Sequence, residues 1–147
     1  MKKFLILFTV FVINSCLVGK AGTPIFRSQL IGEWTLLDDN YKDIYRKWRF
    51  TDGILTQILH YNSINKTEVL RKKYYLCSGV PLKCDSSLVG KVSNGTHIIY
   101  FSNKQKKIRY YEVLSLKNDT LTVRFYHERA IGCEAGYDTI KLKRISR

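Results

Sequence analysis

The sequence lacks the motifs on which most enzyme mechanisms and metal sites depend. It contains no nucleophile elbow, no paired-carboxylate motif and no phosphate-binding glycine loop. It also contains no Cys-x-x-Cys or His-x-His pair, and the spacing of His60, His97 and His127 gives no support for a zinc site. We therefore expect no enzymatic activity, no metal and no cofactor.

Acidic residues are scarce, because 12 Asp and Glu stand against 25 Lys and Arg and give a formal net charge of +13. Such a surplus favours anionic partners, which include nucleic acid, anionic lipid headgroups and acidic glycans. The basic residues are scattered, however, and form short runs only at 71–73 and 104–107. A solvated basic exterior explains this distribution, and a specific anionic partner is the alternative.

The apolar run Phe4–Ile13 is too short to cross a bilayer comfortably, and it follows Lys2 and Lys3 in the arrangement of an export signal. Positions 13–16 then read Ile-Asn-Ser-Cys, which resembles the lipobox of bacterial lipoproteins. The resemblance implies that residues 1–15 are a signal peptide and that Cys16 carries a lipid. A soluble secreted protein cut near residue 15 or 21 is the alternative.

Residues 16–29 contain Gly19, Gly22 and Pro24 without clear periodicity, which indicates a lipidated tether. The membrane would be a partner through Cys16, and anionic envelope lipid would lie beside the protein. Exported proteins rarely meet nucleic acid, so we expect no nucleic-acid partner. Residues 17–20 lack the acidic run that resembles a surface-export signal of Bacteroidetes lipoproteins, which favours an outer-membrane location facing the periplasm.

From residue 30 to residue 147 the sequence predicts a single all-β domain. Short stretches rich in Ile, Val, Thr and aromatic residues recur every 8 to 12 residues or so, between turn signals, and no convincing helix competes with them. The expected strands are Ile31–Leu37, Tyr45–Thr51, Ile54–Tyr61, Glu68–Cys77, Leu88–Val92, Thr96–Ser102, Ile108–Leu116, Thr120–His127 and Asp138–Ile145. Tight hairpin turns of type I′ are expected at Asp52-Gly53, Asn94-Gly95 and Asn118-Asp119, since both central positions of such a turn need the positive φ that Asn, Asp and Gly tolerate.

Alternation along the strands predicts one buried and one wet face. Leu121, Val123 and Phe125 fall on one face of their strand, while the intervening Thr122 and Arg124 fall on the other. A long meander of this kind avoids open edges by closing on itself. We therefore expect one up-and-down antiparallel β-barrel of about eight strands.

The first strand carries Gly32-Glu33-Trp34, which resembles the Gly-x-Trp opening strand of lipocalins and of small lipocalin-like lipoproteins of Bacteroidetes. The resemblance implies that a basic residue of the last strand, Arg144 or Lys143, covers Trp34 at the closed end of the barrel. Gly32, Trp34 and Arg144 would then form a structural plug. The resemblance implies a fold and an anchor but no activity, because members bind small hydrophobic molecules or nothing known.

The cysteines and aromatic residues leave alternatives open. With a lipid on Cys16, three cysteines remain, and the Gly and Pro between Cys77 and Cys84 favour a disulfide between these two, with Cys133 joined to one of them as the alternative. The doublets Tyr74-Tyr75 and 110–111 place one ring on each face of a strand. Inward rings either line a ligand pocket or fill the barrel.

Two functions follow from these observations. The first is a membrane-anchored lipocalin-like binding protein of the bacterial envelope, for a small apolar or amphipathic ligand whose contact residues the sequence does not identify. The second is an envelope interaction protein with a filled barrel, of inhibitor or immunity type, which acts on a protein partner. A basic surface would repel a basic target such as most lysozymes, which disfavours a lysozyme inhibitor.

Overall fold

The computed structural model describes residues 22–37, 43–101, 108–127 and 135–146. The predicted signal peptide, Cys16 and Cys133 lie outside these residues. The elements are β1 (Ile25–Phe26), α1 (Arg27–Leu30), β2 (Gly32–Leu36), β3 (Ile44–Phe50), β4 (Ile54–Tyr61), β5 (Lys66–Cys77), the 3-10 helix η1 (Ser86–Leu88), β6 (Asn94–Gly95), β7 (His97–Tyr100), β8 (Arg109–Lys117), β9 (Thr120–His127) and β10 (Gly136–Ser146).

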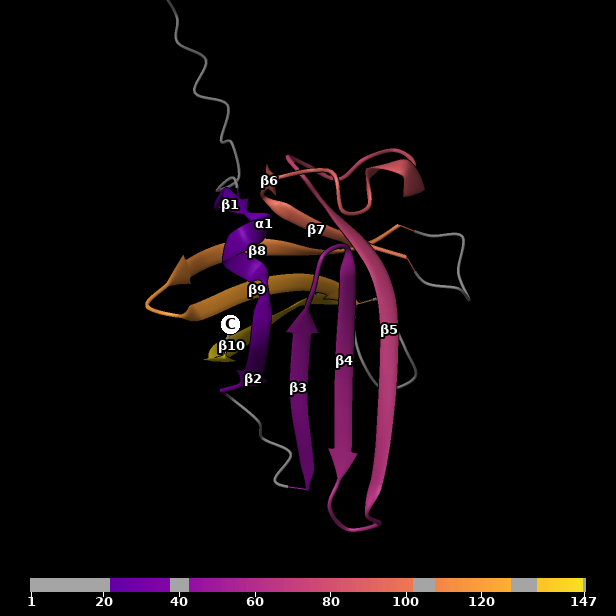
Figure 1. Ribbon diagram of the computed structural model, residues 1–147, viewed down its shortest axis with the longest axis vertical. Helices are drawn as coiled ribbons and strands as arrows, with labels where there is room; N and C mark the ends of the chain where they lie inside the picture. Colours follow the sequence, from indigo (N-terminus) through magenta and orange to yellow (C-terminus); the bar gives the residue numbers. More distant parts are fainter. Residues whose placement is uncertain (1–21, 38–42, 102–107, 128–134, 147) are drawn as a thin grey trace, which may run out of the picture.

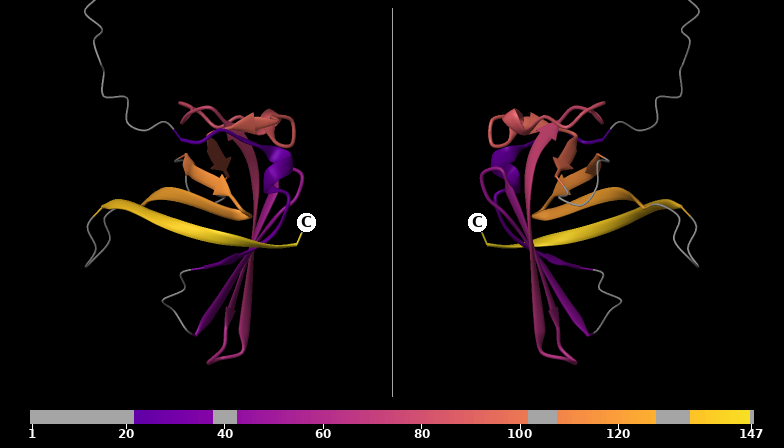
Figure 2. Two further views of the ribbon diagram at one scale, coloured as in Figure 1. Left: turned by 90° about the vertical axis from the view of Figure 1, so that its left-hand side faces the viewer. Right: turned by 90° about the vertical axis from the view of Figure 1, so that its right-hand side faces the viewer.

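The eight longer strands form a closed antiparallel barrel in the order β10-β2-β3-β4-β5-β7-β8-β9. Closure is made by β10, which pairs with β9 on one side and with β2 on the other. The strands β2 to β5 run steeply across the strands β8 to β10 (Figures 1 and 2). The predicted all-β barrel of about eight strands is therefore confirmed.

Two of the three expected turns lie where the sequence placed them. Asn118 and Asp119 have φ values of 50° and 57°, so both central residues of the β8–β9 turn adopt the left-handed conformation that a type I′ turn requires. At the β3–β4 connection Gly53 has a φ of 75°, and the backbone N–H of Thr51 donates to Ile54 over 2.9 Å. Asp52 has no positive φ, so this loop is not of type I′.

The prediction of a hairpin turn at Asn94-Gly95 is wrong. These two residues form β6, which pairs with β1 in a separate two-stranded sheet. Glycine is required at position 95 because a Cβ atom there would lie 2.6 Å from the backbone N and O atoms of Cys77. Its role is close packing against β5 rather than chain reversal.

The prediction of a strand at Leu88–Val92 is also wrong, since η1 and a turn occupy this segment. The Asp85 carboxylate accepts a hydrogen bond from the backbone N–H of Ser87 over 2.9 Å and so caps η1. Gly90, with a φ of 71°, then interrupts any extended conformation. Local capping outweighs the β propensity of the valines here.

The prediction that residues 16–29 form a tether is wrong for the part that the structure describes. Ile25 is buried, and the backbone N–H of Thr23 donates to the Val113 carbonyl over 2.7 Å. Leu30, at the end of α1, is also fully buried in the core. Residues 22–29 therefore belong to the folded domain and pack over one end of the barrel.

The barrel interior is packed at one end and partly uncovered at the other. We call the end beside α1 the closed end, and the opposite end, where β4 runs into β5, the open end (Figure 1). Inward side chains near the closed end are fully buried, among them Trp34, Phe50, Leu55, Tyr74, Leu76, Ile98, Val113, Leu121 and Leu142. Toward the open end, inward side chains are only partly buried or exposed, namely Leu36, Leu59, Leu70, Phe125 and Ile140.

Candidate ligand site at the open end of the barrel

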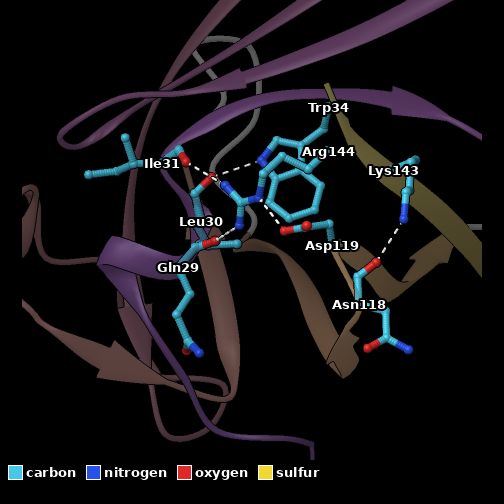
Figure 3. A network of polar contacts seen from close by, with 8 residues as sticks. All are labelled: Gln29, Leu30, Ile31, Trp34, Asn118, Asp119, Lys143 and Arg144. Carbon is cyan, nitrogen blue, oxygen red and sulfur yellow. Dashed lines mark hydrogen bonds and ion pairs between the residues drawn. The ribbon is translucent and has the colours of Figure 1, made fainter. Parts of the chain in front are cut away.

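The three residues of the predicted plug meet at the closed end. Trp34 is fully buried, and its indole N–H donates to the Leu30 carbonyl over 2.8 Å. The guanidinium carbon of Arg144 lies 4.1 Å from the centroid of the Trp34 ring (Figure 3). Gly32 begins β2 with a φ of 130°, a conformation that L side chains rarely adopt. The basic residue over the indole is Arg144, whereas Lys143 turns away and donates to the Asn118 carbonyl over 2.7 Å.

The Arg144 guanidinium also fixes the chain around the plug. It donates to the Ile31 carbonyl over 2.7 Å and to Asp119 over 3.0 Å, and it contacts the Gln29 carbonyl as well. One side chain of β10 therefore holds the segment between α1 and β2 and the β8–β9 turn (Figure 3). These contacts satisfy Arg144 within the protein, so the closed end has the character of a structural seal rather than a ligand site.

The predicted disulfide is not formed, because Cys77 and Cys84 are both free cysteines. Cys77 ends β5, where it pairs with His97 of β7. Cys84 lies beyond a segment of bends and turns that leads into η1. The intervening Gly and Pro predict a chain reversal that would bring the thiols together, but the structure has no bond between them.

The tyrosine doublets divide between the two faces as expected. Tyr111 points into the barrel, with its ring centroid 4.9 Å from that of Trp48 and 4.9 Å from that of Tyr100. Tyr110, its neighbour in β8, lies on the outer face with its ring 5.5 Å from the imidazole of His97. Tyr111 is therefore the centre of an aromatic layer that separates the packed end of the barrel from the open end.

A polar network adjoins this aromatic layer on the inside of the barrel. The Gln57 side-chain amide donates to the Tyr111 hydroxyl over 3.1 Å. The Lys72 ammonium donates to the amide oxygen of Gln57 over 2.7 Å and lies 4.5 Å from the centroid of the Tyr100 ring. Among the described residues, Lys72 therefore contacts neutral groups, and no carboxylate compensates its charge.

Burial favours the neutral form of each ionisable group in this network. Burial, aided by the positive charge of Arg109, lowers the pKa of Lys72 below its ordinary value. Burial raises the pKa of Tyr111 and of Tyr100, so both phenols stay neutral and keep their hydroxyl protons. The site thus combines a cation that no carboxylate of the described residues contacts with neutral hydrogen-bonding groups.

Two arginines share the inward face with Lys72. Arg46 lies two residues before the inward Trp48 in β3, and Arg109 lies two residues before the inward Tyr111 in β8. Because side chains two apart in a strand point to the same face, both arginines belong to the inside of the barrel. The Nε atom of Arg46 is buried. Three basic side chains therefore share an interior that is mainly apolar and aromatic. The same alternation places Lys66 and Glu68, an ion pair with 2.7 Å between ammonium and carboxylate, on the inward face nearer the open end.

The apolar side chains above this network are those that the barrel leaves partly uncovered. Leu70 faces inward beside Gln57, its partner in the β4–β5 register, and is nevertheless 45% exposed. Leu36, Leu59, Phe125 and Ile140 are partly buried inward residues of the neighbouring strands. The open end therefore presents apolar side chains above a basic and aromatic floor, with the Lys66–Glu68 ion pair beyond them. A small amphipathic anion would fit between the floor and the apolar side chains.

The sequence did not identify this site. The period-2 pattern around Tyr74 already places Lys72 inside and Lys73 outside, and an inward lysine in an apolar strand is an informative signal. The contact of Lys72 with Gln57 could not be read from that pattern, because it depends on the pairing of β4 with β5 and on the path of β8.

The described residues contain no group of three or more His, Cys, Asp or Glu side chains that could hold a metal ion. Within the same residues no helix is long and apolar enough to cross a membrane. Comparison with known protein families finds no family model that matches the chain, and comparison with curated proteins finds no matching sequence. The fold itself defines the class of protein, which is a closed eight-stranded antiparallel β-barrel.

Proposed function

We propose that this protein is a lipid-anchored, lipocalin-like binding protein that holds a small amphipathic anion in the open end of its barrel. The observation that carries the proposal is the Lys72 ammonium, which lies inside the barrel against Gln57 and the Tyr100 ring. Placing an ammonium in an apolar interior costs free energy unless an anion compensates it. A bound carboxylate or phosphate would supply that charge.

The ligand would bind with its charged group on the floor of the site and its apolar part toward the opening. The Tyr111 and Tyr100 hydroxyls stay protonated and hydrogen-bond to each other, so the pair can offer one hydroxyl donor to the anionic group. The side chains of Leu59, Leu70 and Phe125 would cover the apolar part. Burial of their exposed surface contributes roughly 25 cal/mol per Å² to binding.

The anchor and the location rest on the sequence. The charged and apolar start of the chain and the Ile-Asn-Ser-Cys segment at positions 13–16 support lipidation of Cys16, and the residues after it favour a periplasm-facing place in the outer membrane. The seal of Trp34 by Arg144 supports the lipocalin-like assignment. Replacing Cys16 with serine should move the protein from the membrane fraction to the soluble fraction, and unchanged membrane association would exclude the anchor.

The proposal predicts that binding affinity depends on the charge of the ligand's headgroup. Isothermal titration calorimetry with laurate and lauryl trimethylammonium below their micelle concentrations, and with lauryl alcohol below its solubility limit, compares one apolar chain with three headgroups. We expect laurate to bind at least about tenfold more tightly than the other two, because it alone of the three carries an anionic group that can pair with the Lys72 ammonium. Equal affinities would reduce the site to an apolar surface, and no binding by any of them would reject the proposal.

One observation favours the alternative, a barrel that binds a protein partner instead of a small molecule. The rings of Trp48, Tyr100 and Phe125 each pack against the Tyr111 ring, and together these four rings occupy the middle of the barrel. If none of the three amphiphiles binds, this filled interior becomes the leading interpretation. A partner would then be sought on the outer face of the strands.

A further inference from the structure

A cleft of about 740 Å³ lies on the outer face of the barrel, on the other side of the sheet from the proposed ligand site. It runs over β3, β4 and β5 and is bordered by Ser86 of η1 and by Phe101 after β7. Arg49, Ile54 and Arg71 line it, and all three alternate in sequence with inward residues. Lys72 also borders the cleft, but its ammonium is held inside the barrel by Gln57.

Three cations converge on this cleft from two strands. Arg49 and Arg71 are both register partners of Thr56, so the three side chains form one row across the sheet. Lys73 stands in the next row, opposite Ile54. Arg71 and Lys73 are exposed, and among the described residues neither has an ion pair or hydrogen bond through its charged group.

The Glu33 carboxylate, near the cleft, is already paired with two cations. The Glu33 carboxylate accepts a hydrogen bond from the Arg49 Nε atom over 2.7 Å, and the Lys47 ammonium contacts the same carboxylate. These two cations hold the pKa of Glu33 below its ordinary value, so it is ionised at neutral pH and already compensated. The cleft therefore keeps a surplus of positive charge.

The wall that carries Ser86 is fixed to the barrel. A Cβ atom on Gly53 would lie 2.7 Å from the Cγ1 atom of Val89, so the turn after η1 packs tightly on the β3–β4 loop. Arg27 joins the same two segments, because its Nε atom lies 3.2 Å from the Asp52 carboxylate and its guanidinium donates to the Gly90 carbonyl. A ligand would meet a preformed cleft, which lowers the entropic cost of binding.

We propose that this outer cleft binds a phosphate group that carries an apolar substituent. Guanidinium groups and an ammonium in separate positions suit an oxyanion with several acceptor oxygens, and the Thr56 and Ser86 hydroxyls add donors. Ile54 and Phe101 supply apolar surface beside the cations. The phosphate would come either from a soluble phosphate monoester or from the headgroup of a phospholipid.

The test compares two variants that lose the same charge. Arg71→Gln with Lys73→Gln removes two cations from the cleft, and Lys117→Gln with Lys141→Gln removes two exposed cations from the other half of the barrel. Phenyl phosphate, followed by calorimetry, represents the soluble source. Vesicles of phosphatidylglycerol and of phosphatidylcholine, followed by flotation, represent the lipid source, and a lipid anchor would insert into both.

We expect the cleft variant to bind phenyl phosphate at least about tenfold more weakly than the control variant. A preference for phosphatidylglycerol vesicles that the cleft variant loses and the control keeps would identify the lipid headgroup as the source. Equal weakening in both variants would overturn the proposal, because net charge alone would then explain binding. Absence of binding to either probe would overturn it as well. The results with phenyl phosphate and with vesicles do not bear on laurate binding at Lys72. The proposal for the outer cleft can therefore be rejected while the proposed function stands.

Discussion

The guanidinium of Arg144 lies over the indole of Trp34, with 4.1 Å between the guanidinium carbon and the ring centroid. The two residues come from the last and the first strand of the barrel, which are paired with each other through their register. Because the same guanidinium donates to the Ile31 carbonyl and to Asp119, the contact joins barrel closure to the seal of the closed end. Stability should therefore depend on this one side chain far more than on its neighbour.

Replacing Arg144 with alanine should lower the free energy of unfolding by about 2 to 3 kcal/mol, since a cation over an indole and charge-assisted hydrogen bonds are lost together. Urea unfolding followed by Trp fluorescence measures this change. Lys143→Ala is the matched control, because Lys143 makes an exposed contact with the Asn118 carbonyl and should cost less than about 0.5 kcal/mol. Equal losses in the two variants would contradict the role assigned to Arg144.

Replacing Gly95 with alanine should destabilise the protein by more than about 2 kcal/mol, because the new methyl group would overlap the backbone of Cys77. Gly79→Ala is the control, since a Cβ atom at that position meets nothing within 4 Å. Thermal unfolding of the two variants gives the comparison. A Gly95→Ala protein as stable as Gly79→Ala would show that β6 does not lie against β5 as described.

The stability of the protein should fall at acid pH partly through His97. Burial lowers the pKa of His97, while Glu112 opposes this shift and Arg124 adds to it. The unfolded chain takes up the proton at about pH 6.5, so this contribution is complete above that pH and declines as the pH falls toward the folded-state pKa. His97→Gln should reduce the difference in unfolding free energy between about pH 8 and pH 5.5. An unchanged difference would contradict this assignment.

Much of the barrel could be predicted because its signals are local. Alternation and flanking turn residues placed β4 and β9 at the residues where the structure has them, and Asn118-Asp119 formed the expected turn. The errors occurred where distant residues decide the conformation. Gly95 resembles a turn residue but is required by the backbone of Cys77, and residues 22–29 resemble a tether but pack against β8.

The two proposed sites could likewise be predicted from the sequence only in part. Strand periodicity separates Lys72 from its neighbours Arg71 and Lys73, and this separation is visible in the sequence. The sequence does not show which groups lie beside each cation. Gln57, Tyr111 and Thr56 belong to other strands, and strand pairing brings them to the cations. The plug was an exception, since a known family pattern related Trp34 to the basic end of the last strand.

The central claim, that Lys72 provides the countercharge for an amphipathic anion, is tested most directly by laurate affinity in two variants. Lys72→Met removes the inward ammonium, and Lys117→Met removes the same charge from an exposed position outside both proposed sites. We predict that Lys72→Met binds laurate at least about tenfold more weakly than the wild type, whereas Lys117→Met binds it with unchanged affinity. Equal affinities in the two variants would contradict the account.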